Sequence, residues 1–99
     1  MNGVVVIDGK EHALRFSVNH VCVMEETEGK ALPALMDGSL LGMRALLWCG
    51  LMEEGITRQQ AGEMLQCYFT DGGSVKELAR VLAQALSDAG YFHLSEEEG

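Results

Sequence analysis

The chain begins with two short apolar segments that flank a turn signal. Residues 4–6 are all valine, residues 11–16 end in an apolar–polar alternation, and Asp8-Gly9 lies between the two segments. An Asp-Gly pair readily adopts the positive φ angles of a type I′ turn, which is the strongest short-range signal for a β-hairpin. The pattern therefore predicts an N-terminal hairpin in which Ile7 lies opposite Lys10.

The alternation sorts the side chains of this hairpin into two faces. One face is apolar and carries Val5, Ile7, Leu14 and Phe16. The second face carries Val4, Val6, Glu11, Ala13 and Arg15. A single buried face does not need Val4 and Val6, so these two valines are left over. Because an isolated two-stranded hairpin is marginally stable in water, we expect it to pack on helices or to pair with another strand.

The remainder of the chain shows the periodicity and the end signals of helices. The segment from Leu40 to about Glu54 is apolar nearly all round, which is typical of a helix at the centre of a core. Two Ser/Thr-x-x-Glu/Gln patterns predict capping boxes that begin later helices. The predicted helical segments start at Ser17 or Asn19 and end near Glu28, span Leu32–Asp37 in one or two turns, span Leu40–Glu54, follow Thr57 with Gln60, and follow Ser74 with Glu77.

These elements predict an α+β fold in which an N-terminal β-hairpin precedes a small array of four to five helices. The chain has 99 residues, which is the size of one domain. We assign residues 1–90 to that single domain. Residues 91–99 end in Glu-Glu-Glu-Gly and are predicted to form an acidic, flexible tail.

The charge balance excludes several classes of partner. Seven basic and fifteen acidic residues give a net charge of −8, and the basic residues are scattered. Nucleic acid would be repelled by such a surface, whereas a basic partner would be favoured. The longest apolar stretch, Leu40–Met52, is too short to span a bilayer and contains Arg44. We therefore expect no membrane segment, and the N-terminus has no signal-peptide pattern.

No residue pattern indicates catalysis, a metal or a cofactor. The three cysteines, Cys22, Cys49 and Cys67, are widely spaced and lie in apolar runs, so we interpret them as reduced core residues of a cytoplasmic protein. No two histidines or cysteines have the spacing of a zinc site. The chain contains no phosphate-binding glycine motif and no nucleophile elbow. We therefore predict a protein that is not an enzyme.

Two groups of glutamates lie at the ends of predicted helices. Glu25, Glu26 and Glu28 precede Gly29, and a second pair lies at residues 53–54. Glutamate is seldom buried, so the prediction is a solvated face. Because carboxylates at a helix C-terminus slightly oppose the helix dipole, the alternative is that a basic partner binds there.

Some apolar side chains remain after the predicted core is filled, and these are the candidates for binding a partner. Val4 and Val6 lie on the second hairpin face, and Tyr91 and Phe92 follow the last predicted helix. A β-branched edge with free amide and carbonyl groups can recruit another strand, including the hairpin of a second copy of the chain. Most of the six methionines are expected to fill the core.

The order of the segments resembles the small tail assembly chaperones of long-tailed bacteriophages, in the branch found in gene transfer agents and related prophages. In that branch a hairpin leads to a helix that ends in a Glu-Glu-x-x-Gly-like stretch, here Glu25, Glu26 and Gly29. An ALLW-like helix follows at Ala45–Trp48, and then a Thr-capped helix from Thr57. The resemblance covers about residues 12–88, within LRFSVNHVCVMEETEGKALPALMDG, MRALLWCGL, ITRQQAGEML and SVKELARVLAQAL.

The resemblance implies an assembly factor that acts in the cytoplasm of the host bacterial cell. Such a protein would bind the tape measure protein, keep it in solution, and assist the tail tube protein as it polymerises. The family's motifs are structural, so no catalytic or ligand-binding residue is carried over. Two alternatives stay open: a structural component of the virion tail, and a small acidic regulatory adaptor such as an antitoxin or an inhibitor.

Overall fold

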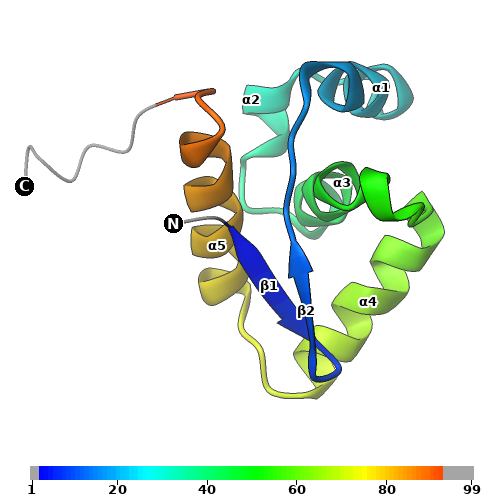
Figure 1. The fold of residues 1–99 in the computed structure, drawn as a ribbon, viewed down its shortest axis with the longest axis vertical. Helices are drawn as coiled ribbons and strands as arrows, with labels where there is room; N and C mark the ends of the chain where they lie inside the picture. Colours follow the sequence, from blue (N-terminus) through cyan, green and yellow to red (C-terminus); the bar gives the residue numbers. More distant parts are fainter. Residues whose placement is uncertain (1–2, 93–99) are drawn as a thin grey trace, which may run out of the picture.

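A β-hairpin is followed by five α-helices in residues 3–92, the part of the chain that the computed structural model describes (Figure 1). The predicted α+β architecture is confirmed. The elements are β1 (Val4–Ile7), β2 (Lys10–Ala13), α1 (Val18–Glu28), α2 (Leu32–Leu35), α3 (Leu40–Gly50), the 3₁₀ turn η1 (Met52–Glu54), α4 (Arg58–Thr70) and α5 (Val75–Asp88).

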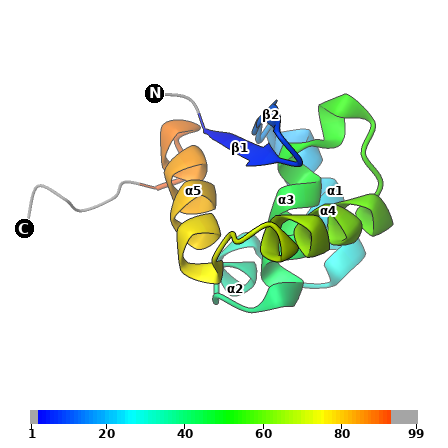
Figure 2. The same cartoon turned by 90° about the horizontal axis from the view of Figure 1, so that it is seen from below.

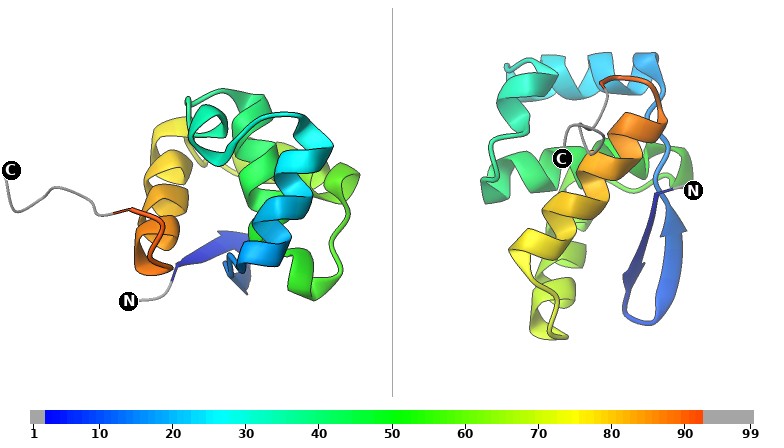
Figure 3. Two further views of the ribbon diagram at one scale, coloured as in Figure 1. Left: turned by 90° about the horizontal axis from the view of Figure 1, so that it is seen from above. Right: turned by 90° about the vertical axis from the view of Figure 1, so that its left-hand side faces the viewer.

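The hairpin has the predicted register. Ile7 pairs with Lys10, and Asp8 and Gly9 between them have φ angles of 55° and 74°, as a type I′ turn requires. The predicted apolar face, which includes Val5 and Ile7, is buried. Strand β1 packs against α4 and α5. Figure 3 shows the hairpin beside α5, with its turn projecting away from α1 and α2.

Helix α3 lies at the centre of the core, as its sequence predicted. It contacts α1, α2, α4 and α5, and Figure 2 shows α4 crossing it. Most of its residues are buried by these neighbours, which explains why its sequence is apolar nearly all round. The buried residues of α3 are Gly42, Met43, Ala45, Leu46, Leu47, Cys49 and Gly50.

Two glycines of α3 allow neighbouring segments to approach closely. A Cβ atom at Gly42 would lie 2.1 Å from the carbonyl oxygen of Leu35 in α2. A Cβ atom at Gly50 would lie 2.8 Å from the Leu14 side chain, and the Gly50 carbonyl accepts a hydrogen bond from the amide of Arg15. Because glycine has no side chain, α2 and the segment after β2 can lie close against α3 at these two positions.

The helix starts agree with the sequence except at one capping box. Ser17 caps α1 by accepting a hydrogen bond from the amide of His20. At α4 the capping box is complete, because Thr57 and Gln60 each accept a hydrogen bond from the other's amide. At α5 the predicted box is wrong in one half. Ser74 caps the helix, but the carboxylate of Glu77 pairs with Arg80 one turn later.

Three boundaries differ from the prediction. Helix α2 ends at Leu35 rather than at Asp37. Helix α3 ends at Gly50 rather than at Glu54, because Leu51 leaves the helical region and the chain tightens into η1 before Gly55. Tyr91 was predicted to begin the flexible tail, but its amide donates to the carbonyl of Leu86 and its ring packs against the core. The rest of the predicted tail, residues 93–99, lies outside the described residues.

Candidate protein-binding surface

The outward side of the hairpin exposes aliphatic side chains. Val4 and Val6 are 40% and 52% exposed, and their strand partners Ala13 and Glu11 are also exposed. We call these four residues the outer hairpin face. The predicted assignment of Val4 and Val6 to the solvent side is correct.

The backbone of β2 is available as well. In an antiparallel pair that closes with the hydrogen-bonded pair Ile7–Lys10, the amide and carbonyl groups of Glu11 and Ala13 point away from β1. Within residues 3–92, neither residue forms a backbone hydrogen bond outside the hairpin. A short two-stranded sheet with an unpaired edge can accept a further strand.

The second predicted pair of contact residues is placed differently. Tyr91 and Phe92 are half-buried and pack against the core. The Tyr91 hydroxyl donates a hydrogen bond of 2.8 Å to the carbonyl oxygen of Phe16. Burial raises the pKa of this phenol above its usual value. Tyr91 is thus part of the scaffold that supports the hairpin, and binding of a partner by it stays a prediction.

The predicted solvated face is wrong for Glu28. Its side chain is only 2% exposed, and its two carboxylate oxygens accept hydrogen bonds of 2.8 Å from Nε and Nη2 of Arg58. The bond to Arg58 holds the pKa of Glu28 below its usual value of 4.5, although burial acts in the opposite direction. The basic partner of this helix end therefore belongs to the same chain.

Two other glutamates also bind within the chain. Glu25 is half-buried and accepts a hydrogen bond of 2.7 Å from the amide of Leu32, which positions α2 after α1. Glu54 lies 2.9 Å from Nδ1 of the buried His12, which connects η1 to β2. Glu26 and Glu53 are exposed, as predicted.

The three cysteines differ in their surroundings. Cys49 is buried, and the loss of hydration raises the pKa of its thiol to about 12, so it stays protonated and unreactive. Cys22 was predicted to lie in the core but is exposed, because α1 buries only Val21 and Met24. All three are free thiols, as predicted.

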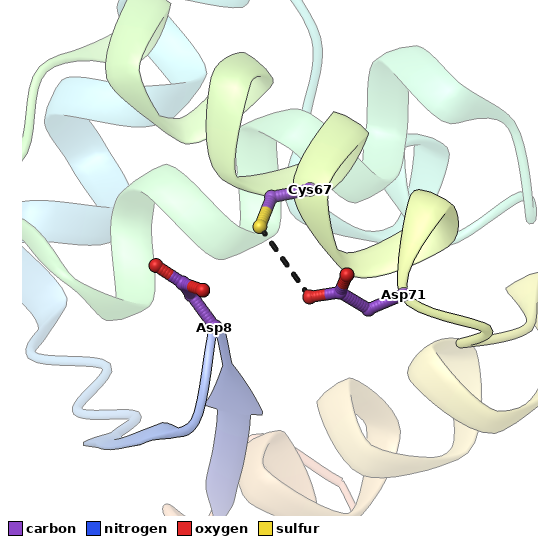
Figure 4. A group of neighbouring side chains, drawn as sticks. All are labelled: Asp8, Cys67 and Asp71. Atoms are coloured by element: carbon purple, nitrogen blue, oxygen red, sulfur yellow. Dashed lines mark hydrogen bonds between the residues drawn. The ribbon is translucent and has the colours of Figure 1, made fainter.

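One cluster has groups that could ligate a metal. Asp8 from the hairpin turn faces Cys67 and Asp71 at the end of α4, and their ligand atoms lie within 4.8 Å of one another (Figure 4). Burial and the charges of both aspartates raise the pKa of the Cys67 thiol, which donates a hydrogen bond of 3.6 Å to Asp71. A structural zinc site has four protein ligands, and this cluster supplies three.

Comparisons with known proteins give no further constraint. No family model matches the chain, and neither a curated protein nor a solved structure matches it significantly. Within residues 3–92, no helix is both long enough and apolar enough to cross a membrane.

A groove between α3 and α4 is the feature that the sequence did not reveal. Its volume is about 390 Å³, and it contains the exposed side chains of Leu40 and Leu41 beside Arg44. The one available signal was a single charge in an otherwise apolar helix. The charge of Arg44 does not by itself predict a groove, because the surroundings of Arg44 depend on how α4 packs across α3.

Proposed function

We propose that this chain is a non-enzymatic tail assembly chaperone of a phage or prophage. It binds the tape measure protein and assists tail tube assembly in the cytoplasm of the host bacterial cell. The observation that carries the proposal is a filled core that nevertheless leaves large aliphatic side chains exposed on several elements. These side chains are Val4, Val6, Val18, Val23, Leu40, Leu41 and Val75.

The proposed role uses two properties of the surface. A tape measure protein is a long helical chain with apolar stripes, and exposed aliphatic side chains can cover such stripes without requiring one fixed sequence, because hydrophobic contact is not directional. The net charge of −8 adds repulsion between complexes, which opposes their aggregation. The segment order quoted above connects this general chemistry to phage tails.

Co-expression tests this function. The tape measure protein encoded beside this chain is expressed alone and together with it, and its soluble fraction is measured after centrifugation. We expect the soluble fraction to rise at least severalfold and the two proteins to co-purify. Unchanged solubility together with no co-purification would refute the proposal. Recovery of this chain in finished particles at the stoichiometry of a tail subunit would favour the virion component instead.

We further propose that two copies associate through the hairpin, which offers an unpaired β2 edge beside exposed valines. Val6→Lys places a charge on the outer hairpin face without touching the buried face. We expect this variant to keep its circular dichroism spectrum and melting temperature and to sediment as a monomer. Val75→Lys is the matched control, since Val75 is similarly exposed but lies on α5. A Val6→Lys variant that sediments like the parent chain would exclude this interface.

A further inference from the structure

The groove between α3 and α4 combines apolar walls with a single cation. We call it the Arg44 groove. Both walls are helical, and Figure 2 shows the two helices crossing. The residues that matter to the argument are Leu40, Leu41 and Arg44 from α3, and Gly62, Gln66 and Phe69 from α4. No Asp or Glu among residues 3–92 lines this groove, although the chain as a whole carries a net charge of −8.

Arg44 differs from the other arginines in having no anionic partner within the described part of the chain. Arg15, Arg58 and Arg80 each lie within 4.0 Å of a glutamate carboxylate, whereas Arg44 forms no ion pair with any residue in 3–92. The Nε atom of Arg44 is buried and has no hydrogen-bond acceptor there. A buried donor without an acceptor is unfavourable, and no hydrogen bond within residues 3–92 fixes the guanidinium of Arg44.

A carboxylate whose pKa responds to Arg44 is already bound. The charge of Arg44 contributes to the lowered pKa of Glu28, but less than Arg58 does. Both oxygens of Glu28 accept hydrogen bonds from Arg58. Glu28 therefore does not pair with the guanidinium of Arg44.

The structure of the groove walls favours a helical ligand over an extended strand. Gly62 lies beside the aliphatic stem of Arg44, and a Cβ atom there would contact Cδ of Arg44 at 3.4 Å. The groove walls are helices, which pair their backbone groups internally except in the first turn of α3, so they offer no edge to a strand. A ligand that satisfies its own backbone, as a helix does, fits such a groove and contributes only side chains.

We propose that the Arg44 groove binds an amphipathic helix whose apolar stripe is interrupted by one aspartate or glutamate. The apolar residues of that helix cover Leu40, Leu41 and Phe69, and its carboxylate accepts hydrogen bonds from Arg44. The chemistry of the ligand follows from the groove alone. Its identification with a helix of the tape measure protein rests on the proposed function.

Synthetic helices test the ligand chemistry without any natural partner. The probe is a leucine-striped peptide of roughly 20 residues, long enough to be helical in water, with one glutamate in the stripe. Two further peptides carry glutamine or lysine at that position. We expect the glutamate peptide to bind the full chain about 10- to 100-fold more tightly than the glutamine peptide, since a charge-assisted bond is replaced by a neutral one. In NMR spectra of the isotope-labelled chain, the backbone amide signals that shift on binding should belong mainly to the groove residues.

Reversing the charge of residue 44 distinguishes a binding role from a structural one. A structural role would not exchange the preference between the glutamate and lysine peptides. Arg44→Glu should invert the preference, so that the lysine peptide binds more tightly than the glutamate peptide. Arg44→Met keeps the aliphatic stem and should remove the preference between the glutamate and lysine peptides. This variant replaces Arg44→Glu in the test if Arg44→Glu fails to fold. Arg80→Glu changes the net charge by the same amount on exposed α5 and should bind like the parent chain. An unchanged preference in both Arg44 variants would overturn the proposal.

The natural partner is tested by repeating the co-expression with these variants. Loss of tape measure binding with Arg44→Glu, but not with Arg80→Glu, supports the identification. Equal binding by both variants excludes the groove as the tape measure site and leaves the chaperone function standing. If the parent chain itself does not bind the tape measure protein, the chaperone function fails, and the peptide series still decides the ligand chemistry of the groove.

Discussion

Replacing Gly42 with alanine is expected to lower the free energy of unfolding by about 3 kcal/mol. The new methyl group would lie 2.1 Å from the carbonyl oxygen of Leu35, which is a backbone atom that no rotamer change can move. Helices α2 and α3 would have to separate, and the buried side chains between them would lose contact. Urea denaturation followed by circular dichroism measures the effect.

Gly62→Ala is the matched control for this substitution. Gly62 also lies within a helix, but its nearest neighbour would be the flexible Arg44 side chain at 3.4 Å. Alanine is the better helix former by about 0.5–1 kcal/mol, so this variant should be as stable as the parent chain or slightly more stable. If Gly42→Ala is no less stable than Gly62→Ala, α2 does not pack against α3 at Gly42.

Replacing Arg58 with alanine is expected to cost about 3 kcal/mol at pH 7, because it leaves a buried carboxylate without its partner. Glu28 is almost fully covered, and both of its oxygens are bonded to Arg58. Arg80→Ala is the control. It removes an exposed pair with Glu77, and such pairs contribute about 0–1 kcal/mol. Equal losses in the two variants would contradict the burial of Glu28.

The pH dependence of the Arg58 variant provides a second test. In the parent chain the folded pKa of Glu28 lies below its usual value of 4.5, so the pair stabilises the fold above that pH and the contribution is lost as the pH falls through the folded pKa. Without Arg58, the largest cause that lowers the pKa of Glu28 is gone, and burial favours the protonated form against the smaller effects of Arg44 and Lys30. The stability gap between the two proteins should therefore narrow on acidification. A gap that stays constant between pH 7 and pH 4 would rule this out.

Local signals in the sequence were sufficient to predict the strands and the helices. Asp8-Gly9 determines the hairpin register through backbone angles that few residue pairs adopt, and Thr57 with Gln60 marks a helix start through bonds between near neighbours. Each of these features depends on residues close together in the chain.

The surface could not be predicted in the same way, because its features join distant segments. Glu28 and Arg58 are 30 positions apart, so the burial of Glu28 depends on how the fold brings the start of α4 to the end of α1. Cys22 lies in an apolar run, yet α1 is covered on one side only. The charge of Arg44 was visible in the sequence, but whether it would find a partner depended on the fold.

The placement of β1 against α4 and α5 has a consequence for synthesis. The hairpin leaves the ribosome before the helices that cover Val5 and Ile7, and Tyr91 joins Phe16 across 75 positions. Until those helices emerge, the apolar side of the hairpin remains open to solvent and to other nascent chains. Closure of this core is a long-range event, so the polypeptide is most vulnerable to misassociation before α5 has emerged.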